Sequence, residues 1–270
     1  MKILSGIELS GYITERQARQ IRQLRQEYKV FPKLAIVQTI DSLVIDRYVH
    51  LKQQYAKDIL AEVEVYKIDQ AKLIDTIQRL NEDNAVHGII VQLPLADTSE
   101  TEQAVNAVIP AKDVDGLSED AMLTPATAMA IDWLLAGYNV ELKGKNIAIV
   151  GNGRLVGAPL ARLWANAGLN VSVYDDTTEN LANEIRKAQV IVTATGVPGL
   201  ITSQMIQPGA VVVDAGTASE NGKLIGDVAE DVRNRSDVTI TPKKGGVGPL
   251  TVTALFDNLI QAARSKAEEL

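Results

Sequence analysis

The segment from Asn146 to Pro159 constrains the fold of this chain more than any other stretch. A short apolar run at residues 147–150 is typical of a buried parallel strand, and Gly151 ends it. Apolar residues return at helical spacing from Leu155 onward. Strand, glycine turn and helix in this order form the context in which a glycine motif indicates a dinucleotide site.

The glycines of this segment are spaced G-x-G-x-x-x-G, which differs from the commoner G-x-G-x-x-G. Gly151 permits a tight turn, Gly153 lets the backbone approach a pyrophosphate, and Gly157 permits close packing of the helix on the strand. The free N–H groups at the start of the helix then face the anion. A plain structural turn without a ligand is the alternative interpretation, because this spacing alone is a weak signal.

Two acidic residues follow the next predicted strand, residues 169–174. Asp175 and Asp176 lie about 20 residues after the glycines, where a dinucleotide fold hydrogen-bonds the ribose 2′-hydroxyl. A carboxylate at this place repels a 2′-phosphate, so the sequence favours NAD over NADP. The alternative is that both aspartates only begin a turn before the next helix.

The bulk properties of the chain exclude several classes of protein. A net charge of −7 over 270 residues argues against a nucleic-acid or anionic-membrane surface. The chain has no cysteine, which excludes disulfides and thiolate metal sites and fits a cytoplasmic protein. With two histidines, a histidine-rich metal site is not expected. No apolar run approaches the roughly 18 residues of a membrane-spanning helix.

Apolar periodicity elsewhere predicts an α/β fold in which strands and helices alternate. The predicted strands are residues 34–38, 62–68, 89–93, 147–150, 169–174, 190–196, 210–216 and 238–242. The predicted helices are residues 9–28, 41–60, 71–81, 102–108, 124–135, 178–187 and 251–267. Residues 245–249 are expected to form a glycine-rich loop. A domain boundary is expected close to residue 123.

Four short motifs occur in an order that is specific when taken together. They are Tyr48-Val-x-x-Lys52, Val91-Gln92-Leu93-Pro94-Leu95, Lys112-Asp113-Val114-Asp115-Gly116 and Gly245-Gly246-Val247-Gly248-Pro249-Leu250-Thr251. With these motifs the chain resembles, over almost its whole length, the bifunctional methylenetetrahydrofolate dehydrogenase/methenyltetrahydrofolate cyclohydrolase family.

The resemblance implies two domains with the active site in the cleft between them. Residues 1–122 and the C-terminal helix, 250–270, are expected to form the α/β folate-binding catalytic domain. Residues 123–249 are expected to form a Rossmann-type NAD(P)-binding domain. The implied substrates are tetrahydrofolate derivatives of one-carbon metabolism, and the implied assembly is a cytoplasmic homodimer paired through the cofactor domain. No nucleic-acid, membrane or metal partner is expected.

The resemblance also implies functions for individual residues. Lys52 is expected to transfer protons, Gln92 to hold its amine, and Tyr48 to stack on the folate, while Asp115 binds the pterin ring. The other expected substrate-binding residues are Val91, Leu93, Pro94, Gly246, Gly248 and Pro249. The expected cofactor-binding residues are Gly151, Asn152, Gly153, Arg154, Val156, Gly157, Asp175, Asp176, Thr195, Gly196, Gly216 and Thr217.

Each of these assignments has a structural alternative. A lysine on a helix is usually a solvated charge, a glutamine at a strand end caps it, and an aspartate before glycine begins a turn. The chain also departs from the family pattern, because the segment after Gly116 is short and Leu123-Thr124-Pro125 replaces Cys-Thr-Pro. Three alternatives therefore stay open: a monofunctional NAD-dependent dehydrogenase, a non-catalytic binding homologue, and another two-domain dehydrogenase acting on shikimate or an amino acid.

Overall fold

A computed structural model describes residues 2–220 and 223–268 of the chain. The chain divides into two compact units. The first, here called the six-stranded unit, comprises Met1–Ser10 and Thr127–Thr251. The second, here called the three-stranded unit, comprises Gly11–Ala126 and Val252–Leu270.

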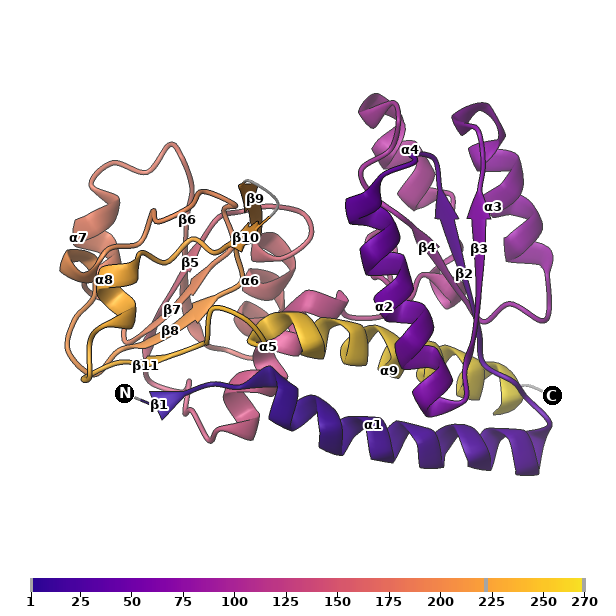
Figure 1. The fold of residues 1–270 in the computed structure, drawn as a ribbon, viewed down its shortest axis with the longest axis horizontal. Helices are drawn as coiled ribbons and strands as arrows, with labels where there is room; N and C mark the ends of the chain where they lie inside the picture. Colours follow the sequence, from indigo (N-terminus) through magenta and orange to yellow (C-terminus); the bar gives the residue numbers. More distant parts are fainter. Residues whose placement is uncertain (1, 221–222, 269–270) are drawn as a thin grey trace. The chain divides into compact units, whose positions relative to one another are not determined.

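The six-stranded unit contains a wholly parallel sheet in the order β1-β11-β8-β7-β5-β6 (Figure 1). Its strands are β1 (Lys2–Ile3), β5 (Asn146–Val150), β6 (Asn170–Tyr174), β7 (Val190–Thr193), β8 (Val211–Asp214) and β11 (Thr239–Ile240). The chain runs from β5 outward to β6 and then returns to β7 on the other side of β5. Ligands of open parallel sheets bind at such a reversal, beyond the carboxyl ends of the strands.

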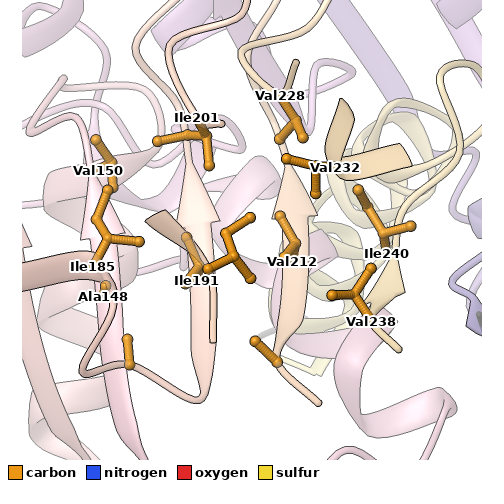
Figure 2. Packing of buried hydrophobic residues seen from close by; sticks show 13 residues of the cluster. Ala148, Val150, Ile185, Ile191, Ile201, Val212, Val228, Val232, Val238 and Ile240 are labelled. Carbon is orange, nitrogen blue, oxygen red and sulfur yellow. The ribbon is translucent and has the colours of Figure 1, made fainter. Parts of the chain in front are cut away.

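Short helices and one hairpin complete this unit. They are α5 (Ala126–Gly137), α6 (Gly157–Asn166), α7 (Leu181–Ile185), the 3-10 turn Ser203–Met205, α8 (Glu230–Arg233), and the hairpin of β9 (Ala218–Glu220) and β10 (Lys223–Ile225). Figure 2 shows apolar side chains of four strands meeting Ile185 from α7 and Val232 from α8. Ala148 and Val150 both belong to this cluster because alternate residues of a strand face the same side of a sheet.

The three-stranded unit contains the parallel sheet β3-β2-β4 (Figure 1). The strands are β2 (Lys33–Gln38), β3 (Glu62–Lys67) and β4 (Gly88–Val91). The helices are α2 (Leu43–Ile59), α3 (Leu73–Glu82) and α4 (Thr101–Asn106), with 3-10 turns at Gln70–Lys72, Thr98–Glu100 and Pro110–Lys112. Helices α3 and α4 share one buried cluster with Ala35 and Val37 of β2, so they cover the same face of the sheet.

Two long helices carry residues of both units. They are α1 (Gly6–Gln23), which continues into a π-helical turn at Leu24–Tyr28, and α9 (Val247–Glu268). The sequence predicted a loop over residues 245–249, but α9 begins at Val247, so Gly248 and Pro249 are helical. Proline is tolerated there because the first N–H groups of a helix have no partner within the helix.

Other elements also differ from the sequence-based expectation, including the unpredicted short helix α8. Helix α7 covers five residues of the predicted 178–187. The strand β1 and the β9–β10 hairpin were not predicted, because two- and three-residue strands carry no readable periodicity. Since Lys2 and Ile3 pair with β11, residues 1–10 group with the six-stranded unit, whereas the sequence placed them in residues 1–122.

A buried histidine makes the three-stranded unit sensitive to acid. Burial, with the charges of Lys266 and Lys112 nearby, lowers the pKa of His87 from 6.5 to about 4. Between pH 6.5 and 4, His87 is therefore protonated in the unfolded chain and neutral in the folded protein. The free energy of unfolding falls as the pH drops through this range. Between pH 8 and pH 5 we expect His87 to cost about 2 kcal/mol of unfolding free energy. Urea titrations of the wild type and His87→Gln at both pH values measure this, and an equal pH dependence of the two proteins would contradict it.

Candidate active site

Helix α2 carries the first two candidate residues on one face. Its buried stripe, which includes Ile45 and Val49, fixes the rotation of the helix against the sheet. Tyr48 and Lys52 are four residues apart and so lie one above the other on this helix. Tyr48 is 39 % exposed, which leaves part of its ring available for a flat ligand.

The structure brings Lys52 and Gln92 together. The Lys52 ammonium donates a 2.8 Å hydrogen bond to Oε1 of Gln92. Gln92 follows β4 directly, and its backbone N–H donates to the carbonyl of Val37 at 2.8 Å, which extends the sheet by one residue. Its side-chain amide donates to the Leu93 carbonyl at 3.1 Å, so its oxygen is turned toward the lysine. The peptide bond between Leu93 and Pro94 is cis.

Burial and charge act in opposite directions on the amine. Desolvation lowers the pKa of Lys52, and the negative charge of Asp115 partly restores it. For Asp115, desolvation acts in the other direction and raises the pKa. The positive charge of Lys52 opposes this shift, and the negative charge of Asp113 adds to it. A lysine whose pKa is moved toward neutrality can both accept and donate a proton at physiological pH. The amine, the amide and the carboxyl group therefore form one polar cluster in the three-stranded unit.

The motif at residues 112–116 is mostly a structural device that presents Asp115. Lys112 is buried, and its ammonium donates to the carbonyls of Leu80, Asn81 and Asp83 at 2.7–2.8 Å. A cation at this place satisfies the unpaired carbonyl groups at the C-terminal end of α3. The sequence does not predict this role of Lys112, although a lysine in a family motif is a detectable signal.

Asp113 organises the loop that follows. Its carboxylate accepts hydrogen bonds from the backbone N–H groups of Gly116 and Ser118 at 2.9 and 2.8 Å, and from the Ser118 hydroxyl at 2.7 Å. Gly116 has a φ of 69°, and a side chain there would collide with the backbone at Leu123 and Pro125. The short segment after Asp115 is therefore folded closely against the residues that replace the family's Cys-Thr-Pro.

The side chain of Asn258, in α9, hydrogen-bonds to both ends of the segment between Val114 and Thr124. Its side-chain amide donates to the carbonyl of Val114 and to the carbonyl of Thr124, each at 2.9 Å. Asn258 is buried, and it stands in none of the motifs that predicted the site. A single asparagine 144 residues away from Val114 carries no local pattern by which it could have been found.

In the six-stranded unit, the glycine turn after β5 has the packing that the sequence predicted for it. A Cβ atom on Gly157 would collide with the carbonyl oxygen of Gly151, so the start of α6 lies directly against the turn. Gly151 itself has a φ of 102° and lies against the backbone of Ala194. A Cβ atom on Gly153 would meet nothing within 4 Å. Space is thus present at the place where a pyrophosphate would approach the backbone.

Other predicted cofactor-binding residues lie at the carboxyl ends of the neighbouring strands. Gly196 lies in the loop after β7 and has a φ of 71°. A Cβ atom added to it would lie 3.9 Å from the carbonyl oxygen of Thr217, in the loop after β8. Thr195 is bound through its N–H and hydroxyl groups to Asp227. Asn152, Arg154 and Val156 lie between β5 and α6. The loops after β5, β7 and β8 are therefore adjacent to one another.

The two aspartates after β6 are exposed. Asp175 Oδ1 accepts hydrogen bonds from the N–H and hydroxyl groups of Thr177, at 3.0 and 2.6 Å, and these bonds lower its pKa. Asp175 thus forms the turn that was the alternative interpretation, while its second oxygen, Oδ2, accepts none of these bonds. A carboxylate in this state remains charged at neutral pH.

The predicted glycine contacts to substrate fall in the six-stranded unit. Gly246, Gly248 and Pro249 belong to it, whereas Lys52 and Asp115 belong to the three-stranded unit. The carbonyl of Gly245 accepts a 2.8 Å hydrogen bond from the N–H of Gly6, which holds the turn before α9 against the start of α1. Within the described parts of the chain, no group of three or more acidic, histidine or cysteine residues could hold a metal ion. No helix among residues 2–220 and 223–268 could span a membrane.

Together, a parallel sheet with glycine-rich loops at its reversal point and a second unit with a Lys–Gln–Asp cluster define a two-domain α/β protein of the dinucleotide-binding class. Residues 4–115 match the family described as tetrahydrofolate dehydrogenase/cyclohydrolase, catalytic domain. Residues 125–267 match the NAD(P)-binding domain of the same family. The chain belongs to the tetrahydrofolate dehydrogenase/cyclohydrolase family, and the resemblance seen in the sequence is confirmed.

Relatives of known name agree with this assignment. The bifunctional protein FolD of Staphylococcus epidermidis is 34 % identical over 277 residues, which cover 97 % of this chain and 96 % of that protein. The crystal structure of the bifunctional enzyme FolD from Campylobacter jejuni superimposes with a TM-score of 0.92 at 33 % identity, covering 98 % and 99 % of the two chains. The Trypanosoma brucei enzyme, complexed with NADP cofactor and inhibitor, gives 0.90 at 30 % identity, with 97 % of each chain covered.

Proposed function

We propose that this protein oxidises 5,10-methylenetetrahydrofolate with NAD(P) and then hydrolyses the methenyl product to 10-formyltetrahydrofolate. The 2.8 Å hydrogen bond between Lys52 and Gln92 carries this proposal, because it presents a partly desolvated amine in a fixed orientation. Family membership supports both activities. The lowered pKa of this amine, together with its fixed orientation toward Gln92, favours a catalytic protein over a homologue that only binds.

The first reaction removes a hydride from the carbon that bridges N5 and N10 of the folate. When bound, the oxidised dinucleotide accepts that hydride. The remaining methenyl carbon carries a delocalised positive charge. We assign Tyr48 to stacking against the folate, and Asp115 to the amino and N–H groups of the pterin ring. Val91, Leu93 and Pro94 would line the substrate site beside Gln92.

The second reaction adds water to the methenyl carbon and opens the ring. Both protons leave the attacking water as the formyl C=O bond forms: one ends on N5, whose bond to the carbon breaks, and the other is released to solvent. Lys52 in its neutral form would accept a proton from water and, in its charged form, donate one to the departing nitrogen. Gln92 would keep the amine in place while its protonation state changes. Gly246, Gly248 and Pro249 would approach the folate with backbone atoms.

We assign dinucleotide binding to the loops of the six-stranded unit. Gly151, Gly153 and Gly157 would receive the pyrophosphate at the start of α6. Asn152, Arg154, Val156, Thr195, Gly196, Gly216 and Thr217 would line the rest of the cofactor site. The family resemblance further supports a cytoplasmic homodimer paired through this unit.

One mixing experiment tests both activities. The protein is mixed with methylenetetrahydrofolate and NAD, and the absorbance of the methenyl product is followed. Its appearance reports dehydrogenation, and its decay above the uncatalysed rate reports hydrolysis. A methenyl signal that appears and does not decay faster than in buffer would leave a monofunctional dehydrogenase, and no signal with either nucleotide would contradict the proposal.

We expect the enzyme to prefer NAD to NADP. Asp175 and Asp176 place two carboxylates after β6, and their charges repel a 2′-phosphate. Initial rates with each nucleotide measure the preference as a ratio of kcat/KM values. Asp176→Ala should raise the ratio of kcat/KM for NADP to kcat/KM for NAD roughly fivefold, because one exposed charge contributes about 1 kcal/mol at contact distance. Equal or better efficiency of the wild type with NADP would refute the preference.

A further inference from the structure

A buried carboxylate lies beneath the two loops that follow β7 and β8. Asp227 is fully buried. Its Oδ2 atom accepts hydrogen bonds from the Thr193 hydroxyl at 2.7 Å, the Thr195 N–H at 2.7 Å and the Thr195 hydroxyl at 2.9 Å. The Thr195 hydroxyl in turn accepts a 3.1 Å hydrogen bond from the N–H of Val197. Asp227 Oδ2 therefore fixes the backbone conformation of the turn that contains Gly196.

The other oxygen of Asp227 explains a glycine in the next loop. Asp227 Oδ1 is buried and has no hydrogen-bond partner among the described residues. A Cβ atom on Gly216 would occupy the position of this carboxylate. Any side chain at position 216 would therefore overlap Asp227. The loops after β7 and β8, which we assign to the cofactor, both pack against this one carboxylate.

A second buried aspartate fixes the position of the first. Asp214, at the end of β8, accepts a 3.0 Å hydrogen bond from the N–H of Asp227 and a 2.6 Å hydrogen bond from the Arg233 guanidinium. Arg233 also donates to the carbonyl of Thr241 at 2.9 Å. The side chains of Asp214 and Arg233 are 4 % and 11 % exposed, so water has little access to the ion pair that anchors Asp227.

From this arrangement we propose that Asp227 is a positioning residue for the dinucleotide. It does not touch the cofactor itself. It holds Thr195 and Gly196 in the conformation that binds the cofactor and leaves room only for glycine at position 216. Three hydrogen bonds to one ionised oxygen are stronger than those to a neutral amide, so a loss of this charge loosens the loop. The inference rests on the proposed function, since it assumes that this unit binds NAD(P).

The test is Asp227→Asn in the full-length enzyme, with Asp231→Asn as the matched control. Asp231 also accepts hydrogen bonds from an N–H and a hydroxyl group, those of Ser203, but it is exposed and lies outside the cofactor loops. We expect Asp227→Asn to raise the Kd and KM for the dinucleotide about tenfold, the difference between charge-assisted and neutral hydrogen bonds. Cyclohydrolase activity, which needs no dinucleotide, should stay within about twofold of the wild type. Asp231→Asn should change neither activity.

A second variant keeps the test decisive if Asp227→Asn does not fold. Thr195→Val preserves the shape of the side chain and removes only the hydroxyl that links Asp227 to Val197. On its own it should show part of the same increase in KM. Where Asp227→Asn does fold, combining the two substitutions should give less than the product of their effects, because both act through one network. Unchanged dinucleotide affinity in both variants would overturn the proposal. Equal losses of both activities would reduce Asp227 to a folding residue, and absence of both activities in the wild type would instead contradict the proposed function.

Discussion

Replacing Lys52 with methionine should abolish methenyl hydrolysis and affect the dehydrogenase far less. Methionine keeps the length and the apolar stem of the side chain but removes the amine that Gln92 holds at 2.8 Å. Proton transfer by a positioned side chain typically contributes roughly 10²- to 10⁴-fold, and we expect a loss of that size in the hydrolysis rate. Hydride transfer moves no proton, so the dehydrogenase depends on Lys52 only for binding and orientation of the folate.

A matched lysine on the same helix controls for the charge change. Lys57 lies in the last turn of α2 and is exposed, so Lys57→Met should leave both activities unchanged. The decay of methenyl absorbance measures hydrolysis, and the rate of its formation with saturating NAD measures dehydrogenation. Hydrolysis by Lys52→Met within a few-fold of the wild type would remove Lys52 from the mechanism. Equal losses of both activities would indicate a general defect in folate binding.

Two alanine substitutions in the glycine turn should have opposite signatures. In Gly157→Ala the new methyl group meets the backbone oxygen of Gly151, which cannot rotate away as a side chain can. We expect the six-stranded unit to lose about 3 kcal/mol, at the upper end of the cost of overpacking. In Gly153→Ala the methyl group meets no protein atom within 4 Å, so stability should change by less than about 0.5 kcal/mol.

Dinucleotide binding should distinguish the same two variants, and here Gly153→Ala should be the one with the defect. The methyl group of Gly153→Ala occupies the space through which the backbone would approach the pyrophosphate, and we expect dinucleotide affinity to fall at least roughly tenfold. Thermal unfolding and dinucleotide titration of both variants measure the two quantities. A stable Gly157→Ala protein, or a Gly153→Ala protein with unchanged affinity, would show that the glycines have other functions than those assigned here.

The α/β architecture was predictable because its central strands are apolar runs and several of its helices are amphipathic. Strands such as β4 and β5 are buried along most of their length, and parallel strands covered on both faces give continuous apolar runs in a sequence. The start of α9 was predicted incorrectly because three glycines and a proline at residues 245–249 indicate a loop. In the structure, Val247, Gly248 and Pro249 form its first turn, where proline lacks only an N–H that has no partner in the helix.

The site was predictable only where its residues stand in motifs. Lys52 and Gln92 were paired on the basis of family resemblance, and the structure places them in contact. Buried residues that hold the site loops in place were not predicted, because their hydrogen-bond partners are distant in the chain. Asp227 binds Thr193 over 34 residues, and Asn258 binds Val114 over 144 residues. No local periodicity or propensity records such contacts, since they arise only when the elements pack together.

The pairing of β1 with β11 has a consequence for biosynthesis. Lys2 is synthesised long before its strand partner Thr239, with most of the six-stranded unit made between them. The three-stranded unit likewise waits for Asn258, which closes the segment between Val114 and Thr124. In a nascent chain β1 therefore stays unpaired until β11 has been made, and the segment between Val114 and Thr124 stays unfastened until Asn258 has been made. Truncation of α9 before Thr251 would remove residues of both units.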